Sequence, residues 1–143
     1  MPRDLTPILK LWTEPVPEDT AAASRAFAEY YADPVLVNGT PLPCSGLVER
    51  ARAQQRAFTG LRIELLEQVE TPEHVAIAFR QSGRHTGPLA TPLGEVPATG
   101  RQIERMVMDI LKFQAGRVTE IHVVGDELGL LVKLDAVTLK ERP

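Results

Sequence analysis

Two aspartates, Asp109 and Asp126, are the side chains of this sequence best suited to acid–base chemistry. Both lie in the stretch 101–134, which reads as two strands, 103–113 and 118–124, joined by a short loop that contains glycine. Apolar residues are the default at such positions. A carboxylate held among them has a raised pKa and can accept or return a proton near neutral pH.

Asp126 follows Gly125 at the end of the second strand. As a general base it would remove a proton next to a carbonyl to give an enolate, and then return the proton to the new alkoxide. Such a group contributes about 10²–10⁴ in rate. The alternative is a turn carboxylate that caps the apolar segment 128–131.

Asp109 shares its strand phase with Val107 and Leu111, and if that phase faces inside, the carboxylate is desolvated. An unpaired buried ion costs several kcal/mol. Asp109 therefore needs a partner, a bound proton or a wet cavity. Its role would be a second acid or an orienting group, and the alternative is a buried salt link to Arg80 or Arg105.

His122 has the same strand phase as Asp126 and stands about 13 Å before it along an ideal strand. It could polarise a carbonyl or hold a water, while a structural histidine is the alternative. Other aromatic and polar side chains are candidates for a ligand pocket, although the aromatic ones are also core residues. The substrate-binding candidates are Trp12, Tyr30, Tyr31, Asn38, Phe58, Phe79, His85 and Met106. For His85 the alternative is a hydrogen bond that fixes a turn.

The composition is that of one soluble domain spanning residues 1–143, with 43% hydrophobic and 24% charged residues. A net charge of −3 argues against nucleic-acid binding. No stretch approaches the roughly 20 apolar residues that span a bilayer, and Cys44 has no partner for an internal disulfide. We expect a cytoplasmic protein that binds neither nucleic acid nor membrane, and no metal-binding spacing is visible.

The periodicity changes from helical to strand-like near residue 60. Three N-terminal helices are followed by long strands, which predicts an α+β fold with a curved antiparallel sheet wrapped around the helices like a cone. Such a sheet would leave a cavity against the helices. The expected helices are 7–12, 20–32 and 46–58, and the expected strands are 35–37, 61–65, 74–85, 103–113 and 118–124. Residues 86–100 are expected to lack regular structure, and the apolar tail 128–137 would extend the last strand or cover the pocket.

The second half of the sequence resembles the SnoaL-like polyketide cyclases, within the nuclear-transport-factor-2-like folds, over roughly residues 58–134. The resemblance rests on several short segments in matching order. These are Val75-Ala76, Gly83–Pro88, Pro97–Arg101, Asp109-Ile110, Phe113, Gly116–Val118, Glu120 and Asp126–Leu131.

The resemblance implies a cofactor-independent enzyme that closes a polyketide ring by intramolecular aldol condensation, with Asp126 as general acid/base. It also implies a homodimer and an apolar, carbonyl-rich ligand. Three positions depart from the family pattern: His122 replaces a tryptophan, Lys133 a glutamine and Ala78 an arginine. The substrate of the best-known members therefore does not transfer. Epoxide hydrolysis in the same cavity and a non-catalytic binding module are the competing functions.

Overall fold

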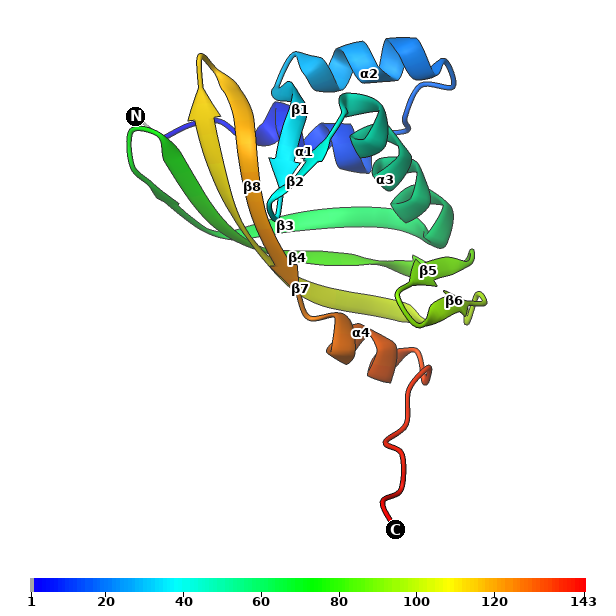
Figure 1. Cartoon of the computed structure of the whole chain (residues 1–143). Helices are drawn as coiled ribbons and strands as arrows, with labels where there is room; N and C mark the ends of the chain where they lie inside the picture. Colours follow the sequence, from blue (N-terminus) through cyan, green and yellow to red (C-terminus); the bar gives the residue numbers. More distant parts are fainter. Residues whose placement is uncertain (1) are drawn as a thin grey trace.

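The computed structural model describes residues 2–143, and within them four helices and eight strands form an α+β fold (Figure 1). The helices are α1 (Thr6–Thr13), α2 (Thr20–Ala28), α3 (Cys44–Ala57) and α4 (Glu127–Lys133). The strands are β1 (Tyr31–Val37), β2 (Thr40–Leu42), β3 (Phe58–Glu70), β4 (His74–His85), β5 (Leu89–Thr91), β6 (Gly94–Val96), β7 (Gln102–Gln114) and β8 (Arg117–Gly125).

Six strands form one curved, mixed sheet in the order β2-β1-β8-β7-β4-β3. The four long strands pair antiparallel, as expected, whereas β1 runs parallel to β8. Helices α1, α2 and α3 lie together on one side of this sheet (Figure 1). The predicted arrangement of a bent sheet around N-terminal helices is therefore confirmed, with one parallel pair, β1–β8, inside the sheet.

The second helix is shorter than the sequence indicated. It ends at Ala28, and Tyr31 already belongs to β1. The cause is pairing with β8, where the Val118 backbone nitrogen donates to the Tyr30 carbonyl at 2.8 Å and Tyr31 aligns with Val118. The Asp33–Pro34 pair lies inside β1 rather than just after a helix, which suits the extended backbone required before proline.

Two helix starts also differ from expectation. Helix α1 begins at Thr6 rather than at residue 7, and α3 begins at Cys44, with Pro43 as its N-cap residue, rather than at residue 46. In α3 the capping acceptor comes from outside the helix, because Asp33 Oδ1 accepts from the Cys44 nitrogen at 3.1 Å. Such long-range caps have no local sequence signature.

The region after β4 is more regular than expected. Residues 89–96 form the small β5–β6 hairpin, and the apolar tail folds into α4 instead of extending β8. Buried Leu130 and Leu134 hold α4 in a second hydrophobic cluster. The other members of this cluster are Ala57, Phe58, Leu89 and Ile103. Burying these two leucines favours a helix over an exposed strand.

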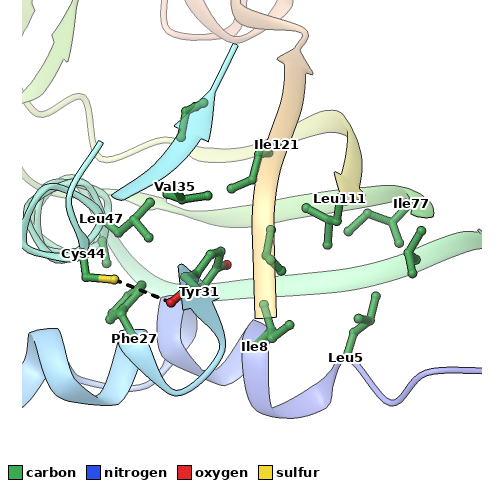
Figure 2. Close-up of a cluster of buried hydrophobic side chains, with 14 of the residues drawn as sticks. Leu5, Ile8, Phe27, Tyr31, Val35, Cys44, Leu47, Ile77, Leu111 and Ile121 are labelled. Atoms are coloured by element: carbon green, nitrogen blue, oxygen red, sulfur yellow. Dashed lines mark hydrogen bonds between the residues drawn. The ribbon is translucent and has the colours of Figure 1, made fainter. Parts of the chain in front are cut away.

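The main core lies between the sheet and the first three helices. Figure 2 shows its side chains converging from the helices and from the concave face of the sheet. Ile8 and Leu47 contribute from the helical side, and Ile77, Leu111 and Ile121 from the strands. This packing does not fill the space completely, and the remaining volume forms the candidate site.

Candidate active site

A cavity of about 410 Å³ lies between the concave face of the sheet and helices α1 and α3. Its size suits a small organic ligand. Most of its wall is apolar, with a few polar groups placed between the apolar ones. The lining residues are Leu5, Ile8, Leu9, Trp12, Tyr31, Val37, Leu47, Arg50, Ala53, Gln54, Ile63, Ile77, Phe79, Gln81, Arg105, Val107, Asp109, Leu111, Ile121, Val123, Gly125 and Glu127.

Asp109 is the one aspartate on this wall. Strand alternation in β7 places it on the inner face with Val107 and Leu111. Its Oδ1 atom is buried and has no hydrogen-bond partner within residues 2–143. Burial raises the pKa of the Asp109 carboxyl to about 6 because an apolar surround disfavours the charged form.

The salt link considered for Asp109 is not formed. Arg80 instead pairs with Glu64 at 3.1 Å, and Arg105 pairs with Glu127 at 2.9 Å. Asp109 is thus a desolvated carboxyl facing a cavity, which is the environment of a general base.

Tyr31 supplies a second polar group on the wall. Its hydroxyl accepts a hydrogen bond from Trp12 Nε1 at 3.0 Å, so its own proton remains available for donation. Burial raises the pKa of Tyr31 well above its ordinary value, and the nearby charge of Asp109 adds to this effect. Tyr31 is therefore a neutral hydrogen-bond donor at physiological pH.

A third polar group is centred on Arg105, which shares the inner face of β7 with Asp109. The Arg105 guanidinium contacts Gln81 and Gln54 within the wall and Glu127 at its edge. From the sequence, Arg105 was expected only as a partner for Asp109, and neither glutamine was predicted to reach the site. The strand phase that residue 105 shares with residues 107 and 109 could have predicted that Arg105 lies on the same face of the sheet as Asp109.

The structure brings together four of the residues proposed from the sequence. Asp109, Trp12, Tyr31 and Phe79 all line the cavity. The remaining candidates lie elsewhere: Tyr30, Asn38, Phe58, His85, Met106, His122 and Asp126.

Asp126 is exposed and is the N-cap residue of α4. Its Oδ1 accepts from the Gly129 backbone nitrogen at 2.9 Å. Asp126 does not line the cavity, and the capping alternative is the arrangement observed. Gly125, the residue before it, completes β8 and does line the cavity.

We expect Asp126→Ala to lower the free energy of unfolding by about 1 kcal/mol, the usual cost of losing an N-cap side chain. Asp126→Asn keeps an acceptor oxygen and should lose much less. Urea denaturation followed by circular dichroism measures both variants. Equal losses would contradict the capping role.

The outer face of the sheet carries three of the other candidates. His122 has a side chain that is 59% exposed, and its nearest carboxylate is Glu120 at 3.9 Å. Asn38 binds the Val123 backbone through both its Nδ2 and Oδ1 atoms, at 3.1 and 2.9 Å. Met106 is also exposed on this face. Met106 and His122 occupy even-numbered positions of β7 and β8, which point away from the helices, and Asn38 lies in the turn between β1 and β2. None of the three lines the cavity between the sheet and the helices, whereas Asn38 and His122 line a depression on the outer face.

Phe58 belongs to the second hydrophobic cluster, and the centre of the His85 ring lies 5.7 Å from the centre of the Phe58 ring. The His85 Nδ1 atom accepts from the Thr99 backbone nitrogen at 3.2 Å, so His85 fixes the loop before β7. Tyr30 is half-buried and packs against the main core. Phe58 and Tyr30 are thus core residues, whereas the buried Nε2 atom of His85 has no hydrogen-bond partner within residues 2–143.

A family model described as SnoaL-like polyketide cyclase matches residues 9–134. The chain belongs to this family. Among solved structures, TsrD from Streptomyces laurentii is similar to this SnoaL-like protein with a TM-score of 0.77 and 21% identity, over 93% of this chain and 92% of that one. A SnoaL-like polyketide cyclase from Agrobacterium tumefaciens gives a TM-score of 0.66 at 17% identity, over 80% and 87% of the two chains. At these identities the likeness demonstrates a shared fold.

No protein with a curated description matches this SnoaL-like chain. In the described part of the chain, residues 2–143, there is no helix with the length and apolar character needed to cross a membrane.

Proposed function

We propose that this SnoaL-like protein is a cofactor-independent cyclase or isomerase of a carbonyl-rich small molecule, with Asp109 as its general base. The observation that carries the proposal is the Asp109 carboxyl, which is unpaired and desolvated on the wall of an apolar cavity. Its pKa of about 6 lies close to neutral pH, where a base both exists in its charged form and accepts protons well.

In the proposed reaction, Asp109 removes a proton from a carbon next to a ligand carbonyl and leaves an enolate. The enolate carbon then attacks a second carbonyl carbon of the same ligand, and a carbon–carbon bond forms. The resulting alkoxide takes back the proton held by Asp109. This intramolecular aldol reaction needs no redox partner. The carboxyl group of Asp109 both removes the proton and returns it, so no second acid or base is required.

Tyr31 is the proposed donor to the enolate oxygen. Its hydroxyl is oriented by Trp12 and keeps its proton at neutral pH. A preorganised donor in a water-poor site stabilises developing negative charge. Trp12 and Phe79 would contact the flat faces of the ligand.

Proton abstraction can be tested without the natural substrate. We expect the protein to accelerate deuterium incorporation into 2-tetralone, a flat ketone with an acidic C–H, in D₂O followed by NMR. Trp12 is the only tryptophan and lines the cavity, so its fluorescence reports entry of the ketone. Quenching of Trp12 fluorescence without faster deuterium incorporation than in buffer would contradict catalysis and favour a purely binding function. The position of Asp126 outside the cavity also favours that alternative.

We also propose that the protein forms a homodimer through the outer face of its sheet. A depression of about 600 Å³ lies on this face, between rows of apolar side chains that cross the paired strands. Val69, Met108, Ile110 and Val124 are exposed there. Exposed apolar surface of this kind is typical of self-association.

We expect the wild-type protein to sediment with twice the 15.7 kDa mass of one chain, and Met108→Glu to be monomeric because two buried carboxylates would meet across the interface. Analytical ultracentrifugation measures both masses. Leu139→Glu is the matched control, since Leu139 is an exposed leucine in the C-terminal tail. A monomeric wild type, or a dimeric Met108→Glu variant, would contradict this interface.

A further inference from the structure

Arg105 places a positive charge on the wall of the cavity, four residues before Asp109 on the same face of β7. Its side chain is only 9% exposed. The strand rise puts the Cα atoms of Arg105 and Asp109 about 13 Å apart. The two groups therefore stand at separate points along the same wall.

Two amide side chains hold the guanidinium in a fixed orientation. Arg105 Nε donates to Gln81 Oε1 at 3.1 Å, and Nη2 donates to Gln54 Oε1 at 3.1 Å. Gln81 Nε2 donates to the same oxygen of Gln54 at 3.3 Å. These contacts satisfy one side of the guanidinium and leave the Nη1 edge for an anion.

The protein's own Glu127 fills that edge. Arg105 Nη1 donates to both carboxylate oxygens of Glu127, at 3.0 and 2.9 Å. The Glu127 side chain is 64% exposed, and an exposed partner on a flexible side chain is held weakly. It lies over the backbone of Gly125, where a Cβ atom would come within 2.8 Å of Glu127 Oε1.

We propose that Arg105, Gln54 and Gln81 form a recognition subsite for a carboxylate on the ligand, and that Glu127 occupies this subsite until the ligand carboxylate displaces it. Arg50, an exposed residue of α3, is a second arginine at the wall of the same cavity. Guanidinium groups bind carboxylates through paired hydrogen bonds. This inference rests on the proposed function, because both require the ligand to occupy this cavity. It restricts the expected ligands to elongated carbonyl compounds that carry a carboxylate.

A pair of matched probes tests the subsite. We expect 2-naphthoate to bind at least tenfold more tightly than neutral 2-naphthamide in isothermal titration calorimetry at pH 7.5, because a charge-assisted hydrogen bond has about this effect on affinity. Glu127→Gln removes the competing carboxylate and should raise naphthoate affinity several-fold. Arg105→Gln should abolish the preference for the acid.

Glu104→Gln is the matched control. Glu104 neighbours Arg105 on β7, is 63% exposed and pairs with Arg80 on the outer face. The control removes the same charge and should leave the ratio of acid to amide affinity unchanged. A structural ion pair between Arg105 and Glu127 predicts instead that Glu127→Gln lowers stability without raising naphthoate affinity.

Equal affinity for the two probes, or no naphthoate binding at millimolar concentration, would overturn the subsite. Failure of the subsite and failure of the proposed catalysis remain distinguishable, because the Asp109→Asn variant should keep the preference for naphthoate. Retained preference without any proton exchange would overturn only the catalytic proposal.

Discussion

Asp109→Asn is expected to reduce the rate of 2-tetralone proton exchange by about 10²–10⁴, the usual contribution of a positioned general base. This corresponds to roughly 3–5 kcal/mol of barrier. Asparagine has nearly the same shape as aspartate and cannot accept the proton. The loss should therefore appear in the exchange rate at saturating ketone, while quenching of Trp12 fluorescence by the ketone stays close to wild type.

Asp126→Asn is the matched control for this experiment. It makes the same chemical change at the carboxylate that caps α4 outside the cavity. We expect it to retain most of the exchange rate. The opposite result, with Asp126→Asn inactive and Asp109→Asn active, would return the catalytic role to the aspartate that the family resemblance indicated.

The strand pattern of the second half was predictable because alternation is a local property. The bounds of β4, residues 74–85, match the expectation, and the strand phase that Asp109 shares with Val107 and Leu111 is the inner one. The β7–β8 hairpin was equally clear from its apolar runs and its loop. In these segments the alternation of apolar and polar residues in the sequence agrees with the alternation of buried and exposed side chains in the structure.

The position of Asp126 was not predictable in the same way. Extending strand phase beyond Gly125 treated Asp126 as part of β8, but the chain turns there and starts α4. What fixes that turn is the burial of Leu130 and Leu134 against Phe58 and Ile103, which lie far away in the sequence. Contacts of this kind override local periodicity, and they also explain why the glutamines that hold Arg105 were missed.

The same carboxyl that is proposed to act as a base should lower the stability of the protein at neutral pH. The pKa of Asp109 rises from an ordinary value of 3.8 to about 6 in the folded state. Between these values the folded protein binds a proton that the unfolded chain has lost. Stability from this group is therefore greatest below about pH 4 and decreases as pH rises to about 6.

A difference of roughly two pKa units corresponds to about 3 kcal/mol. Asp109→Asn removes the titration, so urea denaturation from pH 4 to 7 should give wild-type and variant curves that diverge by about this amount. The variant should be the more stable protein at pH 7. The rate of 2-tetralone proton exchange by the wild-type protein should decline as pH falls below about 6, because Asp109 then becomes protonated. Parallel curves would mean that Asp109 is ionised as easily in the folded protein as in the unfolded chain. A carboxyl in that state would be solvated or paired, and the cavity would then lack the desolvated base on which the proposed chemistry depends.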